Sequence, residues 1–205
     1  AGKEPFLNAS RLFRLMAEAA QIPDRAFLVG IVSNGRHVAA HADAGSTLAA
    51  RLLNGTVVMP GQTFSFNAEI GDMTVDAGFQ VAYGIATENG QTTTVPAEAG
   101  GICQVSTTVF QPVFWTGYEI DQRGWHALWI PRYAYNGIVG LDATVEPTVG
   151  QDFKWTNNTG TAVMLEVYAD GENLTVQLYG TTPNWRVEVD QADVLDAHAR
   201  ERRFA

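Results

Sequence analysis

Alternation of apolar and polar residues is clearest between residues 151 and 180. In "AVMLEVYADG", Val163, Leu165 and Val167 occupy every second position, as expected of a half-buried strand. The Asp-Gly pair at 170–171 follows and predicts a tight hairpin turn. Together with "DFKWTNN" and "NLTVQLYG", this pattern predicts an antiparallel meander of three strands.

Apolar residues at helical spacing predict three helices. They cover residues 6–22, residues 46–55 and a segment from about Ile102 to Trp115. Ser46 is the predicted N-cap of the second helix, and a glycine follows the second and the third as a stop signal.

Shorter apolar stretches predict further strands and complete the fold. "FLVGIVSNGRHVAAHAD" predicts two strands joined by a turn at Asn34-Gly35, and "HALWIPRYAY" and "GLDATVE" predict one strand each. The whole pattern predicts an α+β fold, an antiparallel sheet with a few helices, in which a cysteine begins a central helix. We divide the chain into 1–45, an N-terminal helix and hairpin of the same domain, 46–180, the main domain, and 181–205, a C-terminal extension.

Composition and charge limit the classes of partner. The chain has 205 residues, of which 46% are hydrophobic and 17% charged, which is typical of a globular protein. Its net charge of −9 argues against a nucleic-acid partner, because phosphate binding needs clustered Lys and Arg. We expect this sequence to hold no signal or transmembrane segment, since no apolar run approaches the ~18 residues needed to cross a bilayer. We expect a monomer.

The chain has one cysteine and four histidines. An internal disulfide is therefore excluded. His37 and His41 lie four residues apart, but no third ligand is near them, so we expect no metal site. We also expect no cofactor.

The cysteine, Cys103, lies in "EAGGICQVSTTVF". A lone cysteine is often an inert core residue, but Gly100 and Gly101 allow a tight turn or the close approach of a ligand. The start of a helix lowers a thiol pKa and offers N–H groups to an oxyanion. Gln104 and Ser106 give the thiol polar neighbours. These features favour a nucleophile.

A nucleophilic cysteine usually needs a base, and a third group orients that base. His126 in "RGWHALWIP" is the candidate base, and Asp142 in "GLDATVE" is the candidate orienting group. The alternatives are a half-buried histidine packed against tryptophans, and a carboxylate that pairs with Arg123 or Arg132 instead.

The chain resembles the VanW family through short motifs that recur in the right order. They are "NGTVVMPGQTFSFN", "IGDMTVDAGF", "GGICQVSTTVF", "RGWH", "GLDATVE", "FKWTNNT" and "LYG", and the resemblance covers roughly residues 46–180. Ala99 stands where the family often has a glycine. Gly124 and Ala127 stand where it usually has a histidine and a serine. The matching site positions are Cys103, His126 and Asp142.

The resemblance implies a function in the cell wall. The family name comes from glycopeptide-resistance clusters, and similar domains occur in extracytoplasmic Gram-positive proteins, some of them associated with L,D-transpeptidation. It thus implies an extracytoplasmic or cell-wall-associated cysteine transpeptidase or amidohydrolase that acts on peptidoglycan stem peptides. Cys103, His126 and Asp142 would be catalytic. The expected substrate-binding residues are Gly100, Gly101, Gln104, Ser106, Arg123, Arg132 and Tyr133.

Two other functions stay open. One is a non-catalytic module that binds peptidoglycan, glycan or peptide in a groove lined by Trp125, Trp129, Tyr133 and Tyr135, although we expect these aromatic residues mainly in the core. The other is a structural domain in which Cys103 only fills space. A sulfur that faces a cleft within about 4 Å of a His126 nitrogen would favour the enzyme.

Overall fold

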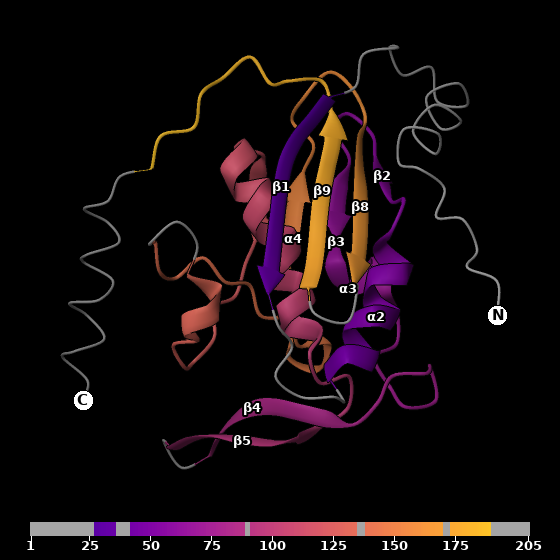
Figure 1. Cartoon of the computed structure of the whole chain (residues 1–205), viewed down its shortest axis with the longest axis vertical. Helices are drawn as coiled ribbons and strands as arrows, with labels where there is room; N and C mark the ends of the chain where they lie inside the picture. The colour runs from indigo at the N-terminus through magenta and orange to yellow at the C-terminus, as the bar shows by residue number, and fades with distance from the viewer. Residues whose placement is uncertain (1–26, 36–41, 89–90, 135–137, 170–172, 190–205) are drawn as a thin grey trace.

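The computed structural model describes residues 27–35, 42–88, 91–134, 138–169 and 173–189 (Figure 1). Within these ranges, helices pack against antiparallel sheets, so the predicted α+β fold is confirmed. The helix predicted over 6–22, the second strand of the predicted N-terminal hairpin and the hairpin turn at 170–171 lie outside the described residues.

A four-stranded sheet forms one side of the molecule. Its strand order is β1 (Phe27–Gly35), β9 (Asn173–Gly180), β8 (Val163–Ala169) and β2 (Val57–Val58). The alternation seen in the sequence is present in β8, because Val163, Leu165 and Val167 belong to the core cluster while Tyr168 is exposed. β8 and β9 pair antiparallel from Met164 opposite Tyr179 to Ala169 opposite Leu174.

The helices and the smaller sheets lie around this sheet. α4 (Ile102–Thr116) contacts β1 and β9, and α2 (Ala42–Leu53) contacts β8 and α4. The remaining elements are β3 (Thr63–Ser65), β7 (Lys154–Thr156) and β6 (Glu119–Gln122), which form a second sheet, the hairpin of β4 (Ala82–Glu88) and β5 (Gln91–Ala97), the short helix α3 (Phe66–Ile70), and the 3₁₀ turns η1 (Pro131–Tyr133) and η2 (Pro147–Val149). Figure 1 shows the β4–β5 hairpin extending along one end of the molecule.

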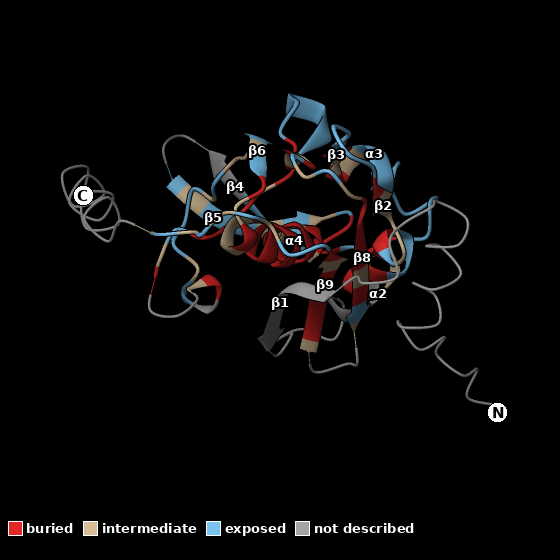
Figure 2. Ribbon diagram, turned by 90° about the horizontal axis from the view of Figure 1, so that it is seen from above, coloured by how far each residue is buried: buried red, intermediate tan, exposed pale blue. Residues whose placement is uncertain are grey.

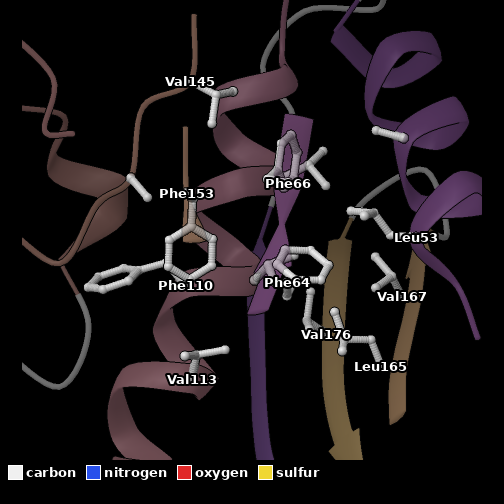
Figure 3. Close-up of a cluster of buried hydrophobic side chains, with 14 of the residues drawn as sticks. Leu53, Phe64, Phe66, Phe110, Val113, Val145, Phe153, Leu165, Val167 and Val176 are labelled. Atoms are coloured by element: carbon white, nitrogen blue, oxygen red, sulfur yellow. The ribbon is translucent and has the colours of Figure 1, made fainter. Parts of the chain in front are cut away.

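The hydrophobic core fixes α4 against the second sheet. Figure 3 shows Phe110 of α4 beside Phe153, and their ring centroids are 5.6 Å apart in an edge-to-face arrangement. Phe64 of β3 packs against Trp155 of β7 at 5.8 Å. α4 is buried almost all round (Figure 2), so its polar side chains must find partners inside the protein.

Two predictions about the first half of the chain are wrong. Asn34 and Gly35 do not form a turn: they continue β1 and pair with Leu174 and Asn173 of β9, because pairing with a distant strand overrides a local turn preference. Ser46 is not an N-cap either. α2 begins at Ala42, which places Ser46 in the buried interior of the helix.

Three predictions about strands in the second half are also wrong. β7 is not part of a meander with β8, because it pairs with β3 and β6 in the second sheet. "HALWIPRYAY" forms no strand in its described part: Pro131 begins a 3₁₀ turn and has no N–H for a ladder. "GLDATVE" makes only the isolated bridges Gly124–Thr144 and Glu146–Gln151, because α4 side chains bind part of its backbone.

Candidate active site

A strained, tightly packed turn places Cys103 at the start of α4. Ala99 and Gly101 both have left-handed backbones, with φ of 52° and 93°. Gly100 lies so close to β4 that a Cβ atom on it would be 2.3 Å from the Cβ atom of Ala82. No side chain fits there without a shift of the backbone. α4 then begins at Ile102, and Cys103 occupies its first turn, where unpaired N–H groups favour a negative charge.

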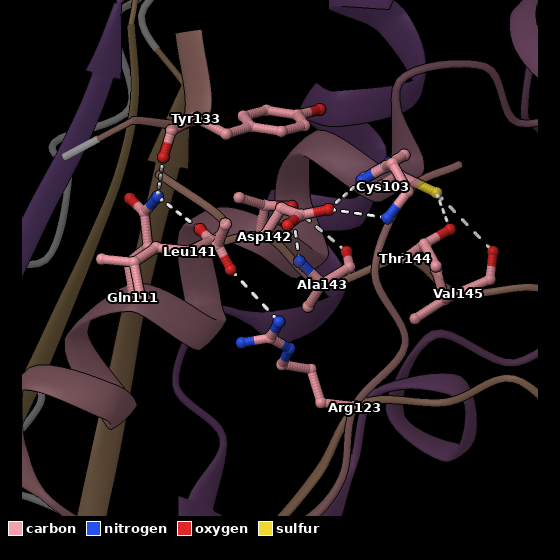
Figure 4. A network of polar contacts seen from close by, with 12 residues as sticks. Cys103, Gln111, Arg123, Tyr133, Leu141, Asp142, Ala143, Thr144 and Val145 are labelled. Carbon is pink, nitrogen blue, oxygen red and sulfur yellow. Dashed lines mark hydrogen bonds and ion pairs between the residues drawn. The ribbon is translucent and has the colours of Figure 1, made fainter. Parts of the chain in front are cut away.

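Buried polar side chains of α4 fasten the segment that carries Asp142. The Thr107 hydroxyl donates to the carbonyl oxygen of Ala143 at 3.1 Å and accepts the N–H of the same residue at 3.0 Å. The Gln111 amide donates to the carbonyl oxygens of Leu141 and Tyr133 at 2.8 and 2.9 Å (Figure 4). The segment from 141 to 145 therefore lies in a fixed position along the helix.

Asp142 holds His126 by two hydrogen bonds to the same carboxylate oxygen. The imidazole Nδ1 lies 2.6 Å from Asp142 Oδ2, and the backbone N–H of His126 donates to this oxygen at 2.7 Å. Both side chains are buried, with 6% and 12% of their surface exposed. Burial raises the pKa of Asp142, but these hydrogen bonds and the charges of His126 and Arg123 outweigh it, so the pKa falls below its ordinary value.

The Cys103 thiol and the His126 imidazole influence each other's ionisation, since each is among the causes of the other's pKa shift. Because Nδ1 faces Asp142, Nε2 is the imidazole nitrogen left for the thiol. The sulfur also lies 3.4 Å from the Thr144 hydroxyl and 3.6 Å from the Val145 carbonyl oxygen (Figure 4). The residue is half-buried.

The pKa values of the pair shift toward a thiolate and an imidazolium. Burial raises the pKa of Cys103, but hydrogen bonds to His126 and Thr144 outweigh it and lower the pKa below its ordinary value. For His126, burial lowers the pKa, but the bonds to Asp142 and Cys103 and their negative charges raise it to about 9. The arrangement can supply a nucleophile and an adjacent acid near neutral pH.

Comparison with known proteins identifies the family. The model of the family described as "VanW like protein" matches residues 44–179, more than half of the chain. The chain belongs to the VanW family. The resemblance inferred from the motifs is therefore confirmed.

Two curated relatives match the VanW region. The chain is 33% identical over 135 residues to the uncharacterized protein YoaR of Bacillus subtilis, covering 66% of this chain and 42% of that protein. It is 32% identical over 133 residues to the vancomycin B-type resistance protein VanW of Enterococcus faecalis, covering 64% of this chain and 46% of that protein. The chain thus spans less than half the length of each relative. No solved structure matches it.

Three of the other predicted residues of this VanW domain are held inside the protein. Gln104 and Ser106 are buried in α4, and neither Gln104 Nε2 nor Ser106 Oγ has a hydrogen-bond partner among the described residues. Tyr133 is also buried, and its ring centroid lies 5.4 Å from that of the His126 imidazole. Tyr133 therefore packs against the imidazole that Asp142 holds.

Of the two arginines predicted to bind substrate, the structure describes the side-chain contacts of Arg123 alone. The Arg123 guanidinium donates to the Gly140 carbonyl oxygen at 3.1 Å and lies 4.9 Å from the centroid of the Phe110 ring. These contacts anchor it beside Asp142. The side chain of Arg132 lies outside the described residues.

Two tryptophans near His126 are exposed, which corrects the expectation that they lie in the core. Trp125 is 71% exposed and Trp129 is 61% exposed. Side chains in an extended segment point alternately to opposite sides. Because His126 points inward to Asp142, its neighbour Trp125 points outward.

The site contains one residue that the sequence analysis missed. The Thr144 hydroxyl lies 3.4 Å from the Cys103 sulfur. Its backbone N–H donates to the Gly124 carbonyl oxygen at 3.0 Å. Its position two residues after Asp142 was a usable signal, because residues i and i+2 of an extended segment share a side.

We predict that Thr144→Val raises the thiol pKa. The valine has a similar shape but lacks the hydroxyl that lowers the pKa of Cys103. The inflection in the rate of alkylation by iodoacetamide against pH should therefore move to higher pH. Thr144→Ser keeps a hydroxyl and is the matched control. Identical profiles for the valine and serine variants would show that the contact has no effect on the thiol.

The described residues contain no cluster of three or more His, Cys, Asp or Glu side chains that could hold a metal ion. In the same ranges, no helix combines the length and the apolar character needed to cross a bilayer.

Proposed function

We propose that this VanW domain transfers acyl groups of peptidoglycan stem peptides through a thioester on Cys103. The observation that carries the proposal is the His126 imidazole, whose Nδ1 lies 2.6 Å from Asp142 Oδ2 and whose interaction with the Cys103 thiol lowers the pKa of that thiol. This order of nucleophile, base and orienting carboxylate is the arrangement of a cysteine acyl-transfer enzyme.

In the first half-reaction, the Cys103 thiolate attacks the carbonyl carbon of the third stem residue. The tetrahedral intermediate then expels the terminal D-amino acid as its amine, and the His126 imidazolium gives that nitrogen a proton. The products are a thioester on Cys103, a neutral imidazole and the free amino acid. A pKa of about 9 for His126 keeps it protonated for this step.

In the second half-reaction, an amine of a neighbouring stem or a water molecule attacks the thioester. Neutral His126 removes a proton from the attacking group, and the thiolate leaves. The original thiolate–imidazolium pair is thereby restored. An amine gives a cross-link and water gives a trimmed peptide. Asp142 keeps the proton on Nδ1, so that Nε2 faces the reacting atoms.

The negative charge on the carbonyl oxygen needs hydrogen-bond donors. The N–H groups of Ile102 and Gln104 already donate to the carbonyl oxygens of Ala99 and Gly101, at 3.1 and 3.0 Å. We therefore assign the role to the N–H groups of Gly101 and Cys103 at the positive end of α4.

The family relationship supports a location in the cell envelope. One relative is named as a vancomycin resistance protein, so we place this protein outside the cytoplasm or at the cell wall. A second candidate function, binding without catalysis, is favoured by the exposed Trp125 and Trp129, since large exposed aromatic side chains often mark binding surfaces.

Trapping the thioester distinguishes these two functions. We expect that muropeptides incubated with the protein and quenched in acid add to the chain, whose one cysteine is Cys103, the mass of the muropeptide less its terminal amino acid. Intact-protein mass spectrometry measures this adduct, and hydroxylamine should remove it. Muropeptides that already end at the third residue are the control, since they have no terminal amino acid to release. Tight binding of muropeptides with no adduct and no released amino acid would favour the binding module.

A further inference from the structure

An open hollow of 380 Å³ is lined by Gln122, Arg123, Gly124, Trp125 and Gln151. Its volume falls within the ~300–1,000 Å³ that is usual for small-molecule sites. The catalytic steps proposed above use none of its side chains.

The hollow adjoins the thiol through one pair of residues. The Gly124 carbonyl oxygen accepts the N–H of Thr144, whose hydroxyl lies 3.4 Å from the Cys103 sulfur. A Cβ atom on Gly124 would be 3.0 Å from Thr144 Cγ2, so these two segments are in close contact. Trp125 directly precedes His126. Neither Cys103 nor His126 lines the hollow, but a ligand in it would contact the segment that joins Gly124 to His126.

The lining residues favour a neutral ligand. Gln122 and Gln151 carry amides, which both donate and accept hydrogen bonds. Arg123 is the one charged residue among the described residues that line the hollow. Its guanidinium already donates to the Gly140 carbonyl oxygen and lies over the Phe110 ring, and the Gln122 amide nitrogen already donates to the Gly150 carbonyl oxygen at 2.9 Å. The Gln122 amide oxygen and the Gln151 amide are therefore the neutral polar groups left for a ligand.

Trp125 gives the hollow a flat aromatic wall. Its side chain is 71% exposed and lines the hollow, so the ring is accessible to a ligand there. The negative face of an aromatic ring attracts positively polarised C–H edges. A pyranose ring matches this wall and the amides together, because its face carries C–H bonds and its rim carries hydroxyl or acetamido groups.

We propose that the hollow is a saccharide subsite that holds a neutral N-acetylated aminosugar against Trp125. The inference rests on the proposed function for its biological setting: a sugar in the hollow would place an attached peptide at Cys103. Saccharide binding itself does not require the thiol.

Calorimetric titration with the β-1,4-linked tetramer of N-acetylglucosamine tests the subsite. We expect the wild-type chain to bind it, and Trp125→Ala to weaken the affinity by about tenfold or more. Trp129→Ala is the matched control, because Trp129 is also exposed but does not line the hollow. The affinity of this variant for the tetramer should stay within about twofold of the wild-type value. Thermal unfolding of each variant shows that the fold is intact.

Three results would overturn the subsite: no binding of the tetramer, equal losses for the two tryptophan variants, or Trp125-dependent binding of a sugar-free stem tetrapeptide. The last result would assign the hollow to the peptide. Cys103→Ala should bind the tetramer as the wild type does. Saccharide binding without any thioester would therefore reject the proposed acyl transfer alone, whereas thioester formation without saccharide binding would reject the subsite alone.

Discussion

Cys103→Ala should abolish turnover of muropeptides and leave the fold almost unchanged. The thiolate is the only group in the proposed mechanism that can form the covalent intermediate, so the loss should be on the order of 10⁴-fold or more. The residue is half-buried at the start of α4 and contacts Thr144 and Val145. Cys103 is only partly buried where it packs against the core, so removing its sulfur should cost little stability. Release of the terminal amino acid measures turnover, and thermal denaturation measures stability.

Cys103→Ser distinguishes the role of Cys103 as a nucleophile from its role in packing, because serine has nearly the same size but lacks the thiol. A hydroxyl has a far higher pKa than a thiol, so the serine variant should be as inactive as the alanine variant while it retains a hydrogen bond to Thr144. Destabilisation of the alanine variant by about 2 kcal/mol or more would instead identify Cys103 as a packing residue. Unchanged turnover in either variant would remove Cys103 from the chemistry.

The fold class could be predicted from periodicity because its strongest signals are local. β8 has core residues at every second position, Val163, Leu165 and Val167, although Met164 between them is also buried. α4 begins at the glycine-rich turn and ends before Gly117. Pairing between distant segments was not visible in the same way. β7 resembles its sequence neighbours β8 and β9, yet it pairs with β3, about 90 residues earlier. No local pattern encodes that choice of partner.

Cys103, His126 and Asp142 were candidates from their residue types and local settings, whereas Thr144 and the environment of the site were missed. The three candidates lie in separate motifs, and the family resemblance related those motifs to one domain. The exposure of Trp125 could not be predicted from its type, because large aromatic residues are usually buried. It depends on His126, whose inward orientation is fixed by two hydrogen bonds to Asp142.

The polar residues of α4 show why burial was also hard to predict. Gln104 and Ser106 were expected to be polar neighbours of the thiol, but both are buried, as is Thr107. Thr107 has an internal role, since it binds both backbone groups of Ala143. A helix that is covered on several sides can carry such residues wherever the neighbouring backbone lacks a regular strand partner. The chain segment 141–145 is such a neighbour.

Turnover should fall on the alkaline side near pH 9. The His126 imidazolium must protonate the leaving amine, and its pKa is raised to about 9, so above that pH the general acid is lost. On the acid side, activity should persist below pH 9.0, the ordinary pKa of the thiol, because the pKa of Cys103 is lowered. The pH dependence of kcat/KM should therefore be bell-shaped, with limbs set by the thiol and the imidazole.

His126→Ala should move the thiol inflection to higher pH, which is the most direct test of the pair. Burial raises the pKa of Cys103, and the hydrogen bond to His126 is the first of the contacts that oppose it. Without the imidazole, only the contacts with Thr144 and Val145 and the helix terminus oppose the rise in the thiol pKa that burial causes. The pH dependence of iodoacetamide alkylation measures the shift, which should exceed that of Thr144→Val.

Asp142→Asn distinguishes orientation of the imidazole from stabilisation of the thiolate. The amide cannot hold a proton on Nδ1 as the carboxylate does, so turnover should fall on the order of 10⁴-fold. The alkylation inflection should shift less than in His126→Ala, because the imidazole is still present beside the sulfur. The helix terminus also lowers a thiol pKa, so the wild-type inflection alone decides nothing. An inflection that stays in place in His126→Ala would show that the thiolate owes its stability to α4 alone, and the proposed triad would then have no base.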